Sequence, residues 1–207
     1  LAAWQAEGVG TRLVARVPGR LPGLYLISTD DAGQRRFYYW RDNAPARLLF
    51  ELPQTPQIEA ALCDYAVVYF SGISLSLYGE LGRGRLLAAL DHARVGGCRI
   101  AFDTNFRPRG WPDPAVARAA YREALGRADI VLASTEDLGL LFGEPQPDEL
   151  PVSNPNVEVV LKLAEPAVRI FHAGKTETIA ADAVGDVIDT TAAGMDADTV
   201  MPANNPR

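Results

Sequence analysis

The chain has 207 residues, 48% hydrophobic and 22% charged, a composition typical of one globular domain with a substantial core. The net charge of -6 and the sequence pI of about 5.0 argue against a nucleic-acid surface, because such binding needs clustered Lys and Arg, and here the Arg residues are scattered. No apolar run approaches the ~20 residues that span a bilayer, so we expect a soluble protein with neither nucleic-acid nor membrane partners.

Cysteine usage indicates a reduced compartment. Only Cys63 and Cys98 occur, far apart in the chain, and each lies beside a segment that we expect to be buried. We interpret them as inert core thiols rather than as a disulfide. No basic-then-apolar leader precedes Leu1, so we expect a cytoplasmic protein.

The N-terminal part combines a helical stretch with a hairpin. Residues 1–7 suit a helix that has no cap and no initiator Met, so we expect that a front piece is missing. Residues 24–28 and 35–40 are rich in β-branched and aromatic side chains, and residues 30–33 between them suit a turn. The pattern predicts a β-hairpin whose aromatic side chains serve either as core or as contacts to a ligand.

From about residue 57 the chain alternates between helices and apolar strands. This alternation predicts a parallel sheet with helices on its faces, in a single α/β domain over residues 1–207. Ligands of such sheets bind beyond the carboxyl ends of the strands, so the residues that follow each strand are candidates for the site. The patterns predict helices over 57–64, 79–95 and 113–127, and strands over 65–70, 99–102 and 129–132.

Two polar loops follow strands of this predicted sheet. Residues 103–107, Asp-Thr-Asn-Phe-Arg, come after one strand, and Pro108 stops regular structure there. Residues 134–137, Ser-Thr-Glu-Asp, come after the next strand and precede apolar residues at helical spacing. From the residues alone, the first loop is equally a solvated turn, and the second is equally a helix cap with acids in the first turn.

The following segment contains a loop and further strands. Residues 144–156 carry four Pro and no periodicity, so we expect a loop. Strands are predicted over 157–163, 167–171 and 176–179. Lys162 lies at the end of the first of these, and from the residues alone a lysine at a strand end is more often solvated.

The stretch 185–194 has the composition of a phosphate-binding turn. An apolar pair leads into Asp189, two Thr and three small residues, which suits a strand that opens into a helix. The first amides of a helix have no internal acceptor and lie at the positive end of its dipole. Ala192, Ala193 and Gly194 are therefore candidates to bind an anion, and an ordinary helix start capped by Thr is the alternative.

Three segments, in series, resemble one family of kinases. The Asp-Thr-Thr-Ala-Ala-Gly at 189–194 resembles the ATP-site signature of the ribokinase-like (phosphofructokinase B) sugar kinases, and in particular of its 2-keto-3-deoxygluconate kinases. The Tyr-Tyr-Trp-Arg at 38–41 is similar to their Tyr-Tyr-x-Arg stretch. Residues 103–107, with Trp111 nearby, are similar to their Asp-x-Asn-x-Arg loop.

The resemblance implies a ribokinase-like three-layer fold, with a mostly parallel central sheet flanked by helices and a small β lid at about residues 21–42. It implies ATP-dependent phosphorylation of an acidic keto-sugar, such as 2-keto-3-deoxygluconate to its 6-phosphate, with Mg²⁺ as a second cofactor and with lids that pair into a homodimer. A guanidinium fork suits a planar carboxylate, and this favours the acidic sugar. The implied site residues are Tyr25, Tyr39, Arg41, Asn105 and Arg107 for the sugar; Ser134, Glu136, Lys162, Asp189 and Thr191 for ATP; Glu136 and Asp137 for magnesium; and Ala192, Ala193 and Gly194 for the developing negative charge.

The chain departs from this family at Met195, where the family has the Asp that takes a proton from the substrate hydroxyl. Residues 195–207 show no helical pattern, so we expect that a segment after Gly194 is missing and that the base lies in it. If Met195 does follow Gly194, Asp196 is the nearest carboxylate. Two alternatives remain open: a ribokinase- or fructokinase-type kinase of a neutral sugar, and a non-catalytic relative that binds nucleotide or sugar.

Overall fold

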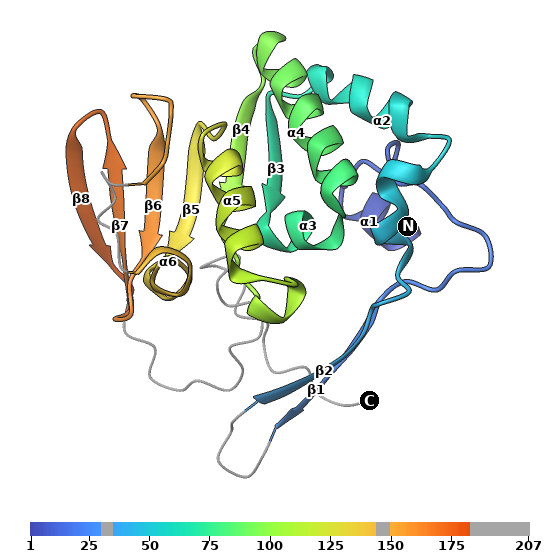
Figure 1. Ribbon diagram of the computed structural model, residues 1–207, viewed down its shortest axis with the longest axis horizontal. Coiled ribbons are helices and arrows are strands. Elements are labelled where there is room, and N and C mark those ends of the chain that lie inside the picture. The colour runs from blue at the N-terminus through green and yellow to red at the C-terminus, as the bar shows by residue number, and fades with distance from the viewer. Residues whose placement is uncertain (30–34, 144–149, 183–207) are drawn as a thin grey trace.

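The computed structural model describes residues 1–29, 35–143 and 150–182. Its centre is a six-stranded sheet in the order β3-β4-β5-β6-β7-β8, so the order in the sheet is the order along the chain (Figure 1). The first four strands are parallel, and the last two continue the sheet antiparallel. The strands are β3 (Val67–Ser71), β4 (Arg99–Asp103), β5 (Ile130–Ser134), β6 (Glu158–Lys162), β7 (Ala167–His172) and β8 (Lys175–Ala180).

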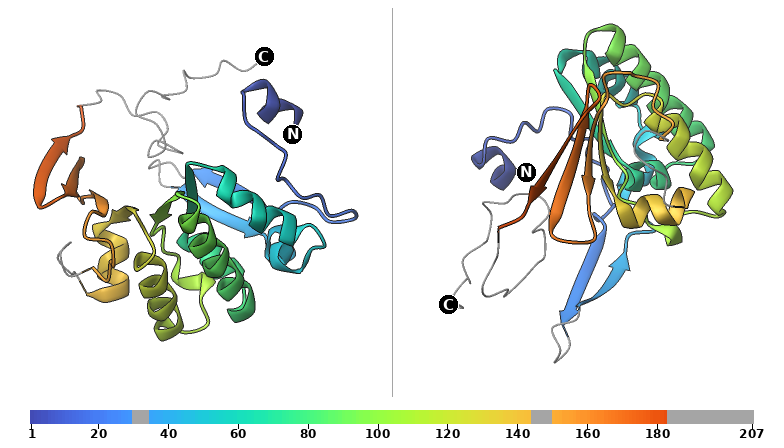
Figure 2. Two further views of the ribbon diagram at one scale, coloured as in Figure 1. Left: turned by 90° about the horizontal axis from the view of Figure 1, so that it is seen from above. Right: turned by 90° about the vertical axis from the view of Figure 1, so that its left-hand side faces the viewer.

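Three helices cover one face of this sheet (Figure 2). They are α4 (Glu80–Val95), α5 (Pro114–Leu125) and α6 (Thr135–Phe142). Alternate side chains of a strand face opposite sides of the sheet. On the side that the helices cover, Ile100, Phe102 and Val131 are completely buried. The other face is more open in the described part of the chain, where Val67 and Tyr69 expose 45% and 58% of their surface.

The helices form where the sequence pattern predicts them. α4 buries Leu86, Leu90 and Ala93, a stripe of apolar residues at helical spacing. α5 starts at Pro114, and the Asp113 side chain before it accepts a hydrogen bond from a backbone amide of the first turn. The expectation of helices and strands in alternation, with a parallel sheet, is therefore confirmed.

Shorter elements connect these parts. They are α1 (Ala2–Ala6), α2 (Thr55–Ala61), α3 (Gly72–Leu77) and three 3-10 turns at Pro45–Glu51, Leu62–Asp64 and Pro108–Gly110. α3 does not follow from the sequence pattern, because its Gly and two Ser are poor helix formers. None of the helices in the described ranges is long and apolar enough to cross a membrane.

The predicted hairpin is present as β1 (Leu24–Thr29) and β2 (Arg35–Trp40), which pair antiparallel. It extends away from the sheet on the side of the carboxyl ends of the parallel strands (Figure 1). Ligands of parallel sheets bind at this side, so the hairpin lies where a lid over a ligand is needed.

Candidate functional site

The carboxyl ends of four adjacent parallel strands form one row of polar residues. The register of the sheet pairs Ser71 with Asp103 and Ser134 with Lys162. Between these two pairs, β4 is joined to β5 at the residue after Asp103: the Thr104 amide donates to the Leu132 carbonyl oxygen over 2.8 Å. The two loops predicted from the sequence and Lys162 therefore do lie along the same edge.

The loop after β4 is anchored by aromatic packing. Asn105 has a φ of 29°, in the left-handed region, which Asn adopts more readily than most residues. The next residue, Phe106, is buried and packs edge-on against Tyr121, with ring centroids 5.6 Å apart. Arg107 follows as an exposed side chain whose Nη1 donates to the Phe106 carbonyl oxygen over 2.8 Å. The loop thus presents a cation at the edge of the sheet from a rigid support.

A buried hydrogen-bond chain lies directly beneath this loop. The Thr104 hydroxyl donates to Asp137 Oδ2 over 2.7 Å, and the Tyr121 hydroxyl donates to the Thr104 carbonyl oxygen over 2.6 Å. Thr104 and Tyr121 are completely buried, and Asp137 is 7% exposed. Burial and the negative charges of Asp137 and Asp103 raise the pKa of the Tyr121 phenol, so it remains a hydrogen-bond donor well above neutral pH.

Asp103 has a partner on the neighbouring strand. The Tyr69 hydroxyl donates to Asp103 Oδ2 over 2.7 Å, from β3 to β4. Partial burial, this hydrogen bond and the charge of Asp103 together raise the pKa of the Tyr69 phenol. The pair therefore fixes the Asp103 carboxylate at the start of the loop, on the face of the sheet opposite to the helices.

The second predicted loop is the N-terminus of α6. Ser134 is the N-cap, and its Oγ accepts the Asp137 amide over 3.1 Å. Glu136 is exposed in the first turn, whereas Asp137 is directed into the core toward Thr104. The predicted helix cap is therefore present. The same first turn leaves Glu136 exposed at the carboxyl ends of the strands, where ligands of parallel sheets bind.

Of the two predicted magnesium ligands, Glu136 is exposed at this edge, whereas Asp137 is buried and accepts the Thr104 hydroxyl. Among the residues that the structure describes, no group of three or more His, Cys, Asp or Glu is arranged to hold a metal. Magnesium in nucleotide sites is held by one or two carboxylates together with phosphate oxygens and water. Glu136 supplies one exposed carboxylate, and the buried Asp137 stands next to it.

The predicted sugar-binding residues of the hairpin form a cluster of their own. Tyr25 and Tyr39 are register partners with ring centroids 6.5 Å apart, and the Arg41 guanidinium lies 4.2 Å from the centroid of the Tyr39 ring. Within the described ranges, no hydrogen bond or ion pair joins this cluster to Asn105 or Arg107. The two predicted sugar-binding groups therefore lie toward the same, carboxyl, end of the parallel strands, with no hydrogen bond or ion pair between them in the described part of the chain.

The remaining predicted residues lie outside the described part of the chain. They are Asp189, Thr191, Ala192, Ala193, Gly194 and Asp196.

The family described as pfkB family carbohydrate kinase matches residues 1–200 of the chain. The chain belongs to this family. It is 39% identical over 200 residues to the 2-dehydro-3-deoxygluconokinase of Dickeya dadantii (strain 3937), with 94% of this chain and 64% of that protein covered. It is 36% identical to the protein of the same name from Escherichia coli (strain K12), covering 94% and 65%. It is 30% identical to the probable fructokinase-2 of Arabidopsis thaliana, covering 85% and 53%.

Solved structures confirm the ribokinase-like fold. The PfkB protein from Polaromonas sp. JS666 has a TM-score of 0.72 and 24% identity, with 89% of this chain and 62% of that chain covered. A putative ribokinase II from E. coli, solved in complex with ATP and Mg²⁺, has a TM-score of 0.73 and 22% identity, covering 93% and 60%. The chain thus spans 64% and 65% of the two 2-dehydro-3-deoxygluconokinases and 53% of the probable fructokinase-2.

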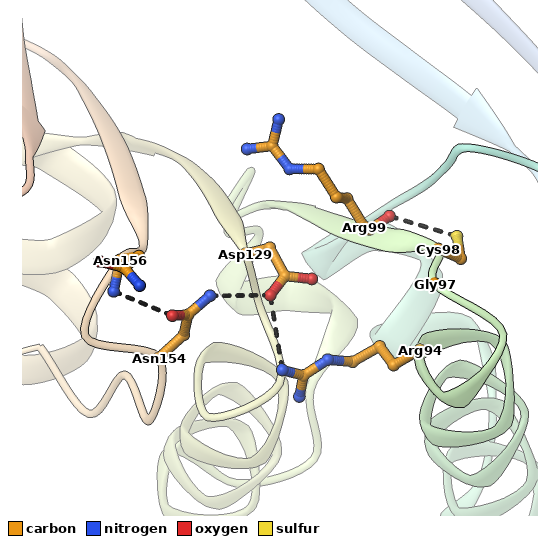
Figure 3. A pocket seen from close by; sticks show the side chains of 7 residues that line it. All are labelled: Arg94, Gly97, Cys98, Arg99, Asp129, Asn154 and Asn156. Carbon is orange, nitrogen blue, oxygen red and sulfur yellow. Dashed lines mark hydrogen bonds and ion pairs between the residues drawn. The ribbon is translucent and has the colours of Figure 1, made fainter.

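A separate pocket lies at the opposite edge of the sheet, at the amino ends of β4 and β5. It has a volume of about 370 Å³, and Arg94, Asp129 and Asn154 meet in it (Figure 3). Asp129 Oδ1 accepts hydrogen bonds from Asn154 Nδ2 over 2.9 Å and from Arg94 Nη2 over 3.4 Å. These groups satisfy one another, so the pocket is a structural junction away from the edge that carries the kinase motifs.

Sequence reasoning missed several residues that build the site. The hydrogen bonds of the site involve Tyr69, Thr104 and Tyr121. Gly72 leaves space for two of these residues, since a Cβ at this position would overlap the Tyr121 hydroxyl and the Thr104 carbonyl oxygen. Gly72 lies two residues after the predicted strand 65–70 and directly after β3, so the rule that ligands bind at the carboxyl ends of strands could have found it. Thr104 lies in the predicted loop 103–107, but its buried hydrogen bonds, and the contribution of Tyr121, involve partners distant in sequence and leave no local signal.

Proposed function

We propose that the whole protein transfers the γ-phosphoryl group of ATP to an acidic keto-sugar, most simply 2-keto-3-deoxygluconate, to give its 6-phosphate. The observation that carries the proposal is the 39% identity, over 94% of this chain, to a protein named 2-dehydro-3-deoxygluconokinase, which is another name for a kinase of the same sugar. The exposed Arg107, held at the carboxyl edge of the sheet, supports an acidic substrate because a guanidinium binds a carboxylate in bidentate geometry.

In this proposal the described residues hold the two substrates. Asn105 and Arg107 bind the sugar acid from the loop after β4. The hairpin cluster of Tyr25, Tyr39 and Arg41 closes over the sugar from the opposite side as a lid. Ser134, Glu136 and Lys162 bind ATP at the neighbouring strand ends, with Asp137 behind them. Bound magnesium neutralises charge on the phosphate oxygens.

The reaction needs a base and an anion site, which we place in the C-terminal part of the domain. The sugar hydroxyl oxygen forms a bond to the γ-phosphorus, the bond from that phosphorus to the bridging oxygen of ATP breaks, and ADP leaves. The hydroxyl proton passes to a carboxylate, which we place in a segment that follows Gly194 in the whole protein, with Asp196 as the alternative. The amides of Ala192, Ala193 and Gly194, together with Asp189 and Thr191, are proposed to stabilise the developing charge.

We also propose that two lids pair into a homodimer in the cytoplasm. Leu24, Leu26 and Trp40 expose 62%, 51% and 60% of their surface on a two-stranded ribbon with open edges. Cys63 and Cys98 are both free thiols, in keeping with a reducing compartment. Sedimentation of the full-length protein is expected to give a dimer, and the Leu26→Glu variant a monomer; a monomer at all concentrations without the substitution argues against pairing.

The test of the function is an ATP-dependent assay of the full-length protein on 2-keto-3-deoxygluconate, with fructose and ribose as neutral competitors. We expect a clear preference for the acid. Arg107→Ala should weaken binding of the acid about 10- to 150-fold, the loss of one charge-assisted contact of about 1.5–3 kcal/mol, and should change fructose binding little. Arg109→Ala, an exposed Arg of the same segment, is the matched control.

The same assay separates the alternatives. Preference for fructose or ribose, with Arg107→Ala neutral, would support a kinase of a neutral sugar. Binding of nucleotide and sugar without release of ADP would support a non-catalytic relative.

A further inference from the structure

Thr104 has all three of its polar groups bonded at the junction of three elements. Its amide donates to Leu132 on β5, its carbonyl oxygen accepts the Tyr121 hydroxyl from α5, and its own hydroxyl donates to Asp137 Oδ2 on α6. The side chain is completely buried. A residue bonded in this way has one available position, so the backbone on either side of it is fixed.

Thr104 lies between the two parts of the proposed site, the sugar-binding loop after β4 and the nucleotide-binding first turn of α6. Asn105 and Arg107 continue from Thr104 and carry the sugar-acid contacts. Asp137 belongs to the first turn of α6, which also carries Glu136 and follows the Ser134 cap. The bond between Thr104 Oγ1 and Asp137 Oδ2 therefore connects the sugar half directly to the nucleotide half.

The burial of this bond makes it a strong link. Asp137 is 7% exposed, and a carboxylate taken out of water depends on the donors around it. Hydrogen bonds to a charged group in a low-dielectric interior are stronger than those at the surface, and removing the donor costs the desolvation of the group left behind. Displacement of either half is therefore resisted by the other.

We infer that Thr104 is a positioning residue that couples the two substrate sites, so that an acidic sugar on the β4 loop and magnesium-bound nucleotide at the α6 N-terminus each tighten the binding of the other. The inference rests on the proposed function. Coupling of this kind is reciprocal and typically amounts to about 5- to 150-fold in affinity.

The experiment measures this coupling in the full-length protein by titration calorimetry. The dissociation constant of 2-keto-3-deoxygluconate is determined with and without a saturating non-hydrolysable ATP analogue and Mg²⁺. We expect the analogue to tighten sugar binding at least about fivefold in the native protein and in Thr104→Ser, which keeps the hydroxyl. In Thr104→Val, which has the same shape without the hydroxyl, the ratio should fall toward one.

A second variant distinguishes coupling from stability. Tyr121→Phe removes a buried hydrogen bond on the other side of Thr104 and leaves the bond to Asp137 in place. It should lower the unfolding midpoint, as Thr104→Val does, and yet retain the coupling ratio. A loss of the ratio in Tyr121→Phe as well would show that any damage to the core has this effect and would overturn the inference.

The outcomes also separate this inference from the proposed function. If the native protein binds no acidic sugar, the proposed function fails. If it binds both ligands without coupling, or if Thr104→Val retains the full ratio, the inference fails and the function stands. Should Thr104→Val not fold, Thr104→Ala removes the same hydroxyl, and an unchanged ratio in that variant also overturns the inference.

Discussion

Gly72 has no room for a side chain. A Cβ at this position would overlap the Tyr121 hydroxyl and the Thr104 carbonyl oxygen, both of which belong to the buried hydrogen-bond chain. Gly72→Ala is therefore expected to lower the free energy of unfolding by about 1–3 kcal/mol, the usual range for overpacking a core. Urea denaturation followed by circular dichroism measures the change.

Gly84 gives the matched control for this prediction. It lies inside α4, and a Cβ there meets nothing within 4 Å. Gly84→Ala should raise the free energy of unfolding by about 0.5–1 kcal/mol, because Ala restricts the unfolded chain and favours the helix. Equal midpoints for the two variants would contradict the assignment of Gly72 to a closed contact.

Tyrosine ionisation gives a pH-dependent prediction. The pKa values of Tyr69, Tyr78 and Tyr121 are raised, chiefly by burial, so these phenols remain neutral in the folded protein after free tyrosines have ionised. The unfolded chain ionises near pH 10, so their contribution to stability is complete below that pH and is lost as the pH rises above it.

An ultraviolet titration of tyrosinate checks this. We expect Tyr69, Tyr78 and Tyr121 to ionise only as the protein unfolds. Tyr121→Phe should reduce the loss of stability with rising pH. A single ionisation step near pH 10 in a protein that is still folded would be evidence against the burial of these hydroxyls.

At the scale of elements, the N-cap of α5 is a site where one side chain stabilises one helix. Asp113 accepts a hydrogen bond from the Ala115 amide, and it lies outside the proposed substrate contacts. Asp113→Ala should cost about 0.5–2 kcal/mol of stability, while Asp113→Asn, a residue of equal capping ability, should cost little. Thermal unfolding of the two variants measures the difference, and equal losses would mean that the cap does not act through its hydrogen bond.

The elements differ in how far the sequence predicts them. The long helices and the strands of the sheet follow from apolar periodicity and from caps such as Asp113 and Ser134. α3 could not be predicted in this way, because its six residues include one Gly and two Ser, and it forms where Ser71 and Ser74 cap each other in reciprocal hydrogen bonds directly after β3. Tertiary position overrides weak propensity there.

The candidate site divides in the same manner. The position of Arg107, Ser134, Glu136 and Lys162 at the carboxyl ends of the strands could be predicted from the order of apolar strands and polar loops, whereas their proposed roles rest on the family resemblance. The bond between Thr104 and Asp137 could not be predicted, since the two residues are 33 positions apart and meet only through the register of β4 and β5. Local patterns predict which edge carries the chemistry, and packing decides which side chains support it.

At the scale of the whole molecule, Asp129 connects several elements at the amino ends of the strands, opposite to the proposed site. Its Oδ2 accepts the Ile100 amide over 2.8 Å, and its Oδ1 accepts bonds from Arg94 and Asn154, so a single side chain joins α4, β4, β5 and the segment before β6. Asp129→Ala leaves these donors without their acceptor and should lower the free energy of unfolding by about 1–3 kcal/mol.

Glu158 is the control for this prediction, because its ion pair with Arg99 lies at the same edge but is more open to solvent, with 40% and 52% of the two side chains exposed. Glu158→Ala should cost less than about 1 kcal/mol. Chemical denaturation of both variants makes the comparison, and an equal loss would show that Asp129 has no special place in the sheet.

The strand order β3-β4-β5-β6-β7-β8 has a consequence for how the protein is made on the ribosome. Among the strands that the structure describes in this sheet, each one after β3 pairs with the strand synthesised just before it, so none of these has to wait for a distant partner or be inserted between two that have already paired. The sheet can therefore grow by addition at one side as the nascent chain emerges, and the polar row at the carboxyl ends is completed from Ser71 toward Lys162 in the direction of translation.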